Sequence, residues 1–203
     1  MNGKLSQEII FLILCNTSLW AKWNNPEIVV SSLGFLLAMT EKVMIILGID
    51  PGIADTGFGV IKKEDNGDLK CLDYGSIKTK AKTPIGDRLE IINIELNKII
   101  KKYKPSVVAV EELFFCNNQK TAIVVGQARG VVILTIKQNK VRFLEFTPLQ
   151  VKQAVSTYGK ASKLQVQKMV KIILGLKEIP KPDDAADALA IAICATSNFH
   201  NIV

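Results

Sequence analysis

From Met44 onward, short apolar runs alternate along the chain with longer segments of helical periodicity. The run "IILGID" at 45–50 has the length and composition of a buried strand, and it ends in a charged residue, Asp50. Two more strands are predicted at 57–62 and 69–78. The "DNGD" between them indicates a tight turn, so we expect these two strands to form an antiparallel hairpin.

The remainder of the chain alternates helices and strands. Apolar residues at helical spacing predict a helix that begins near Pro84 and runs to 103. The apolar segments "PSVVAVEE" and "VRFLEFT" predict two further strands, and helices are expected at 117–138, 148–156, 163–174 and 184–197. This order predicts an α/β fold with a central mixed five-stranded sheet and helices on both faces.

Residues 1–43 differ from the rest of the chain. They hold two apolar stretches, 9–15 and 28–39, each shorter than the roughly 20 residues that a membrane-spanning helix needs. Because the α/β pattern starts at Met44, we expect 1–43 to be an N-terminal extension outside the fold, encoded upstream of the start codon used in the cell. An amphipathic or targeting extension is the alternative.

The charge of the chain is uneven. Lys and Arg number 26 against 19 Asp and Glu, a net charge of +7, and the segment 137–177 holds nine basic residues and one acidic residue. This excess suits a polyanion or an anionic membrane surface as partner, with a solvated lysine-rich surface as the alternative. The single histidine, His200, lies near the end of the chain, so chemistry based on a histidine base is not expected. The four cysteines lack CxxC spacing, which favours a reducing compartment, the cytoplasm.

Four carboxylates occupy the ends of predicted elements. Asp50 and Glu111 end apolar strands, at the sheet edge where open α/β folds bind ligands. Asp184 and Asp187 are three residues apart and share one face of the last helix. Each acid alone has a structural explanation as a turn or first-turn residue, and Asp183 has the position of a helix N-cap. Together, without a histidine, they favour hydrolysis of phosphodiesters by Mg²⁺ or Mn²⁺, with two ions close together.

Five segments in order resemble the bacterial RuvC-type Holliday junction resolvases: "IILGIDPGIADTGFGVI", "VVAVEELFF", "GQARGVV", "VKQAV" and "DDAADALAIAI". The resemblance covers nearly all of 44–197. It implies a ribonuclease H-like fold for a nuclease domain at 44–203, and Mg²⁺-dependent symmetric nicking of four-way DNA junctions in recombination and repair. It also implies a homodimer and the motor partners RuvA and RuvB.

The resemblance assigns roles to individual residues. The metal ligands of the family fall on Asp50, Glu111, Asp184 and Asp187. The phenylalanine that probes the junction matches Phe114, and the basic pair at the active site matches Lys152 and Lys163. As departures from the family pattern, Glu112 stands where an amide is frequent and Asp183 precedes the usual Asp-Ala-Ala-Asp; whether either assists the site stays open.

The predicted helix at 117–138 is apolar over most of its circumference, so it should be covered on two sides. Gly126 and Gly130, four residues apart, permit a close backbone approach on one side. We expect the sheet on one side and the same helix of a second subunit on the other. A buried helix inside a monomer is the alternative.

Two other functions compete with the junction nuclease. The loop "GIDPGIADTG" also resembles the first phosphate loop of phosphotransferases of the actin and sugar-kinase type, but a second phosphate loop and an adenosine pocket are not found in the sequence. The other alternative is an inactive module that binds DNA junctions. The complete set of carboxylates argues against it, because idle acids beside phosphates would weaken DNA binding.

Overall fold

The computed structural model describes residues 44–112 and 119–198, and within it residues 43–203 group as one unit. The predicted extension at 1–43 lies outside the described residues. All five strands are found, and each begins within two residues of its expected start. They are β1 Met44–Asp50, β2 Asp55–Lys63, β3 Leu69–Lys78, β4 Val107–Glu111 and β5 Arg142–Phe146.

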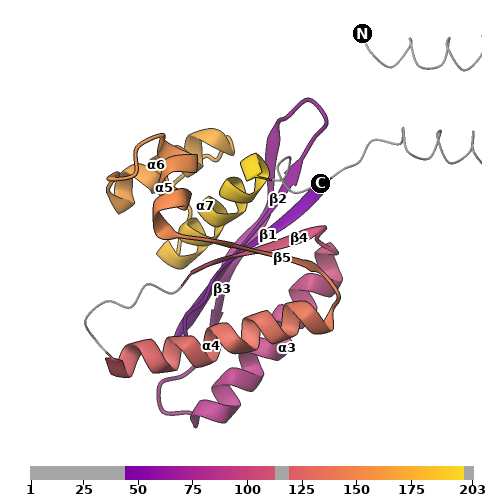
Figure 1. Ribbon diagram of the computed structural model, residues 1–203, viewed down its shortest axis with the longest axis vertical. Coiled ribbons are helices and arrows are strands. Elements are labelled where there is room, and N and C mark those ends of the chain that lie inside the picture. The colour runs from indigo at the N-terminus through magenta and orange to yellow at the C-terminus, as the bar shows by residue number, and fades with distance from the viewer. Residues whose placement is uncertain (1–43, 113–118, 199–203) are drawn as a thin grey trace, which may run out of the picture. The chain divides into compact units, whose positions relative to one another are not determined.

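Helices follow the strands in the predicted order (Figure 1). Proline or a hydroxyl residue precedes three of them, which explains why their starts could be located: Pro84 stands at the N-cap of α3, Thr147 at that of α5 and Ser162 at that of α6. The helices are α3 Ile85–Tyr103, α4 Gln119–Gln138, α5 Pro148–Ser156, α6 Lys163–Ile173 and α7 Asp183–Asn198.

The sheet is mixed, with strand order β3-β2-β1-β4-β5. Strands β1, β2 and β3 form an antiparallel meander, which confirms the predicted hairpin. Strands β4 and β5 each follow a helical crossover and pair in parallel, β4 with β1 and β5 with β4. The carboxyl ends of β1, β4 and β5 therefore lie at one edge of the sheet.

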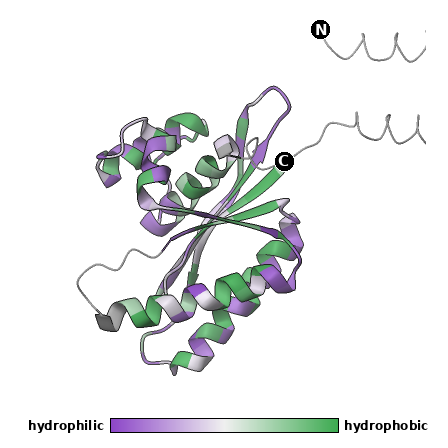
Figure 2. Ribbon diagram, viewed as in Figure 1, coloured by the Kyte–Doolittle hydropathy of each residue, from purple (hydrophilic) through white to green (hydrophobic). Residues whose placement is uncertain are grey.

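Helices cover both faces of this sheet, as the sequence predicted (Figure 1). Because side chains alternate between faces along a strand, neighbouring residues of β4 enter different cores. Val107 and Ala109 join the core beneath α5, α6 and α7, whereas Val108 and Val110 join the core beneath α3 and α4. Figure 2 shows β1 as hydrophobic over much of its length, in keeping with a central strand between two layers.

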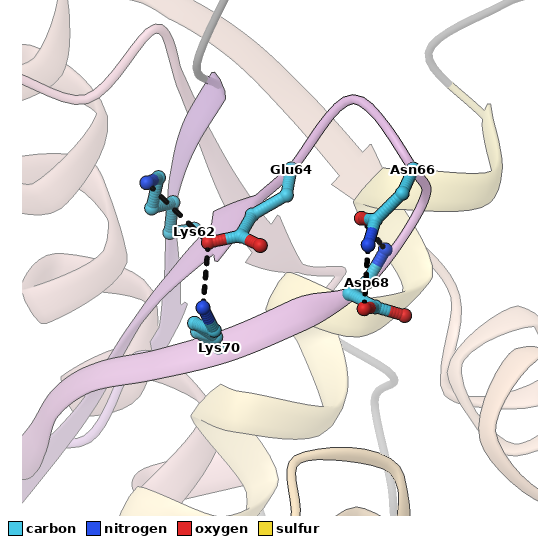
Figure 3. A network of polar contacts seen from close by, with 5 residues as sticks. All are labelled: Lys62, Glu64, Asn66, Asp68 and Lys70. Carbon is cyan, nitrogen blue, oxygen red and sulfur yellow. Dashed lines mark hydrogen bonds and ion pairs between the residues drawn. The ribbon is translucent and has the colours of Figure 1, made fainter. Parts of the chain in front are cut away.

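The hairpin between β2 and β3 ends in a polar turn (Figure 3). Glu64 lies between Lys62 and Lys70, with Nζ–Oε1 distances of 3.5 and 2.8 Å. The side-chain amide of Asn66 donates to Asp68, and Gly67 takes a left-handed φ of 89°, which glycine adopts without strain. These contacts are far from the carboxyl ends of β1 and β4 along the strands, so we treat the turn as a structural feature.

None of the helices in the described part of the chain is long and apolar enough to cross a lipid bilayer.

Candidate active site

Asp50 and Glu111 lie at the ends of two neighbouring parallel strands. Strands β1 and β4 run in parallel, and the last pair in their register is Ile49 and Val110. Asp50 and Glu111 are the next residues of the two strands and the last residues of each. Parallel pairing therefore places both acids at the carboxyl edge, as the sequence predicted.

Helix α7 contributes the other two acids because it packs very closely on the sheet. Gly57 lies opposite Asp50 in the antiparallel β1–β2 pair. A Cβ at Gly57 would overlap the backbone carbonyl of Asp184, and a Cβ at Gly48 would overlap that of Ala188. Because no side chain fits at either position, both residues have to be glycine. Their absence of a Cβ allows the first two turns of α7 to pack directly on β1 and β2.

The four acids form one electrostatic cluster. The pKa of Asp50 is raised to about 7, first by burial and then by the charges of Asp187, Glu111 and Asp184, in that order of importance. Burial and the charge of Asp187 also raise the pKa of Glu111. For Asp187, burial raises the pKa and outweighs the opposing effect of the bond from Lys163. Such mutual repulsion identifies a site whose ionised acids would be stabilised by additional positive charge.

Two lysines border the acids. Lys163 is the first residue of α6, where a capping box of Ser162 and Gln165 fixes the start of the helix. Its Nζ lies 2.8 Å from Asp187 and 3.6 Å from Asp183. Burial lowers the pKa of Lys163, but the bond with Asp187 and the nearby acids raise it more, so the ammonium stays charged.

Lys152 lies on α5, and its charge and that of Lys163 partly offset the rise in the pKa of Glu111 that burial and Asp187 cause. Between α5, α6 and α7 the molecule has a hollow of about 230 Å³. Its polar wall consists of Glu111, Asp187 and the two lysines, and its apolar wall includes Val151 and Val166. The structure thus places both predicted lysines beside predicted acids.

The donor set fits a hard divalent cation. Within the described ranges, no three acidic, histidine or cysteine side chains already surround a common point as a metal cage. The four acids nevertheless supply only oxygen donors, which Mg²⁺ and Mn²⁺ prefer. The raised pKa values of Asp50, Glu111 and Asp187 show that added positive charge would stabilise the ionised forms of these three acids. Lys163 provides one such charge and would compete with a cation for Asp187.

The loop after β1 is held by a side chain from α3. Arg88 donates from Nε to Oγ1 of Thr79 (2.8 Å) and from its terminal nitrogen to the carbonyl oxygen of Ile53 (3.2 Å). Thr79 itself donates to the same carbonyl (2.5 Å). Thr56 closes the loop from the other side by donating to the carbonyl of Gly52. The chain that follows Asp50 is therefore fixed on both sides.

Three further residues named from the sequence have different outcomes. Phe114 lies outside the described residues. Glu112 is exposed, and its backbone N–H extends the β4–β5 pairing by donating to the carbonyl of Phe146. Asp183 was expected at the N-cap of the last helix, but the helix begins at Asp183 itself after Pro182, whose carbonyl accepts the first helical bond. Its carboxylate is free to approach Lys163 instead.

Sequence reasoning missed two arginines near this edge, Arg88 and Arg129. Arg129 of α4 donates to the backbone carbonyl of Glu111 and forms an ion pair with Glu145. The available signal was a lone arginine inside an otherwise apolar helical segment, "IVVGQARGVVIL".

The chain is similar to known proteins over most of the described residues. The family model described as "Crossover junction endodeoxyribonuclease RuvC" matches residues 46–195. A curated relative of that name from Caldicellulosiruptor saccharolyticus is 56% identical over 151 residues, which are 74% of this chain and 91% of the relative. One from Halothermothrix orenii is 55% identical over 156 residues, 77% of this chain and 94% of the relative.

Solved structures give the same result for the fold. The structure of T. thermophilus RuvC in complex with a Holliday junction substrate matches with a TM-score of 0.72 and 35% identity, over 78% of this chain and 97% of that chain. The yeast mitochondrial Holliday junction resolvase Ydc2 matches with a TM-score of 0.57 at 15% identity, over 77% of this chain and 80% of that chain. At that identity the likeness concerns the fold alone. The predicted ribonuclease H-like architecture with its mixed five-stranded sheet is confirmed.

Proposed function

The chain belongs to the RuvC family of crossover junction endodeoxyribonucleases, and from that premise we propose that it resolves Holliday junctions by symmetric nicking during recombination and DNA repair. It is a metal-dependent nuclease that acts on phosphodiester bonds. The observation that carries the proposal is the electrostatic coupling of Asp50 to Asp187, Glu111 and Asp184. These four acids come from three separate elements, β1, β4 and α7, that meet at one sheet edge.

The metal ligands in this proposal are Asp50, Glu111, Asp184 and Asp187. Mg²⁺ is the proposed ion, two per site, with Mn²⁺ as a substitute, because all four donors are carboxylate oxygens. When bound, the ions would supply an activated water and stabilise the leaving oxygen. The chain contributes the rest: β1 and β4 fix two acids in register, and the close packing of α7 fixes the other two.

Lys152 and Lys163 are the proposed phosphate contacts. Both line the hollow beside Glu111 and Asp187, so a phosphate in that hollow would meet ammonium groups and acids together. The Lys163 side chain is 53% exposed and can turn from Asp187 toward a DNA strand. Contacts of this kind make binding steeply dependent on salt. Phe114, outside the described residues, is proposed to stack against an unpaired base.

A homodimer through α4 is also part of the proposal. One side of α4 packs in the core with Ala128, Val132 and Ile136, as expected for the side that faces the sheet. The other side exposes Ile123 (65%), Leu134 (56%) and Gly130, where a Cβ would meet nothing within 4 Å. These residues are spaced by seven and four positions, so they share one face of the helix. A second copy would cover that face, and a two-fold dimer suits symmetric cutting.

The family resemblance also leads us to propose RuvA and RuvB as partners, the cytoplasm as location, residues 44–203 as the nuclease domain and 1–43 as an extension outside it. The family match over 46–195 supports the division of the chain.

One assay separates the proposed function from its competitors. The protein is incubated with a synthetic four-way junction or a linear duplex of the same sequence, with Mg²⁺ and with Mg²⁺ plus ATP. Paired symmetric nicks in the junction alone support the resolvase. ATP turnover without nicks would support a phosphotransferase, and binding of the junction without nicks would support an inactive junction-binding module.

A further inference from the structure

We propose that Arg129 is a positioning residue for Glu111, acting through the main chain. Its Nε donates to the backbone carbonyl oxygen of Glu111 (3.4 Å), and its guanidinium forms an ion pair with the Glu145 carboxylate. The Arg129 side chain is only 19% exposed. The planar guanidinium can bond two acceptors at fixed relative positions, which a lysine ammonium does less well.

The geometry of the sheet explains how one side chain reaches both partners. Val110 belongs to the core beneath α3 and α4, and Glu145 lies opposite Val110 in the parallel β4–β5 pair. Glu145 therefore projects toward α4, from which Arg129 comes. Glu111 follows Val110, so its side chain projects to the other face, where it lines the hollow with Asp187. Arg129 thus contacts the backbone of Glu111 from the face of the sheet opposite to the Glu111 carboxylate.

This contact completes a set of anchors at the end of β4. On the β5 side, the backbone N–H of Glu112 donates to the carbonyl of Phe146. On the α4 side, Arg129 holds the carbonyl of Glu111 itself. The two bonds restrict the peptide plane that follows Glu111, and with it the direction of the Glu111 side chain. A carboxylate that has to meet the same ion as Asp50 and Asp187 needs such a fixed direction.

The effect of Arg129 is geometric and does not depend on its charge at the Glu111 carboxylate. The cations that lower the pKa of Glu111 are Lys152 and Lys163. The charge of Arg129 is matched instead by Glu145. Removal of either partner would leave a partly buried charge without its ion pair, which is destabilising.

The inference rests on the proposed metal-dependent nuclease and deepens it. Loss of a group that orients a metal ligand typically costs about 10- to 100-fold in metal affinity or activity. We expect losses in this range for Mn²⁺ affinity and for the single-turnover cleavage rate of Arg129→Gln. Binding of a four-way junction in EDTA should stay within about twofold of wild type, because that binding depends mainly on exposed lysines.

The test uses the full chain and the variants Arg129→Gln, Arg129→Lys, Glu145→Gln and Arg129→Gln/Glu145→Gln. The control is Lys101→Gln, which removes one positive charge near the end of α3, away from the site. Mn²⁺ binding to DNA-free protein is measured by electron paramagnetic resonance. Junction binding in EDTA, single-turnover cleavage, oligomeric state and Tm are measured on the same samples.

Arg129→Lys is the decisive variant if Arg129→Gln folds poorly, because lysine keeps the ion pair with Glu145 but cannot hold both acceptors. We expect it to bind Mn²⁺ more weakly than wild type with little change in Tm. The double variant should regain Tm relative to Arg129→Gln, but it should not regain Mn²⁺ affinity.

Two outcomes would overturn the inference in distinguishable ways. If wild type binds Mn²⁺ and Arg129→Lys binds it equally well and cleaves at the same rate, Arg129 has a structural role only and the proposed function stands. If wild type neither binds Mn²⁺ nor cleaves the junction, the proposed function fails, and the inference fails with it.

Discussion

The ammonium nitrogen of Lys163 lies 2.8 Å from the carboxylate of Asp187, so the cluster of acids contains a counter-ion from its own chain. Lys163 is the first residue of α6, and Asp187 lies about one turn into α7. The charge of the same lysine partly offsets the raised pKa values of Asp50, Glu111 and Asp187, three of the four clustered acids. A divalent cation and Lys163 would therefore stabilise the same negative charge and compete for it.

This competition predicts opposite effects of Lys163→Met on metal binding and on cleavage. Without the ammonium, Mn²⁺ affinity of DNA-free protein should rise about threefold to tenfold, since a nearby unit charge at a partly exposed site is worth on the order of 1 kcal/mol. Cleavage of a junction should fall by about tenfold or more, because a phosphate contact is lost. Lys168→Met, an exposed position on the same helix, serves as control. Equal Mn²⁺ affinity in the two variants would contradict the competition.

The raised pKa of Asp50 predicts that metal-free protein loses stability as the pH rises. In the folded chain the pKa is about 7, against 3.8 for the free side chain, so between these values the folded state retains a proton that the unfolded state releases. The free energy of unfolding therefore falls across this window, by at most about 4 kcal/mol for this group. Asp50→Asn should remove this contribution and raise Tm at pH 8 in EDTA, with little effect near pH 4.

Glu64→Gln is the matched control for that experiment. The bond from Lys70 and the charges of the neighbouring lysines lower the pKa of Glu64. Its ionised form therefore stabilises the folded state at pH values above the usual pKa of a glutamate. Replacing Glu64 should leave Tm at pH 8 unchanged or slightly lower, the opposite direction from Asp50→Asn. Thermal unfolding of both variants at pH 4, 6 and 8 gives the comparison. A lower Tm for Asp50→Asn at pH 8 would be inconsistent with a crowded acid cluster.

The close approach of α7 to the sheet predicts that replacement of Gly57 costs both stability and cleavage activity. A Cβ at Gly57 would overlap the backbone of Asp184, and only a movement of the whole first turn of α7 could relieve this. Gly57→Ala should destabilise the fold by about 1–3 kcal/mol and also reduce cleavage, because Asp184 moves away from Asp50. Gly86→Ala, in α3 where nothing lies within 4 Å, should instead stabilise by about 0.5 kcal/mol. Urea unfolding of the pair measures both; equal effects would disprove the contact.

The exposed face of α4 predicts how the dimer can be dissociated. Leu134→Glu places a charge in the proposed interface, so sedimentation at micromolar concentration should show monomer for this variant and dimer for wild type. Ile172→Glu, the control, changes an equally apolar residue that is 68% exposed on α6, beneath the other face of the sheet. A wild-type monomer, or a dimer that survives Leu134→Glu, would contradict the proposed interface.

Much of the fold could be predicted because its boundaries are marked by residues with defined backbone effects. Asn66-Gly67 marks the hairpin, and Pro84 marks the start of α3. The alternation of apolar strands and helices then leaves few ways to build the sheet. The four acids could be singled out because they end elements whose order already places them at one edge.

The rest depends on packing that the sequence does not encode locally. The ion pair of Lys163 with Asp187 requires the position of α6 on α7, and the contact of Gly57 with Asp184 requires that of α7 on the sheet. Arg129 could not be assigned from its motif, since its partners Glu111 and Glu145 come from two different strands. The beginning of α7 was placed one residue late because Asp183 resembles an N-cap, whereas Pro182 takes that place.

The most direct test of the account is cleavage of a synthetic four-way junction by wild type, Asp50→Asn and Asp68→Asn in Mg²⁺. Asp68→Asn makes the same chemical exchange at the exposed β2–β3 turn. We expect wild type and Asp68→Asn to produce paired nicks at symmetric positions, and Asp50→Asn to bind the junction but to cut it at least about 100-fold more slowly. Undiminished paired nicking by Asp50→Asn would show that the clustered carboxylates are not the catalytic centre.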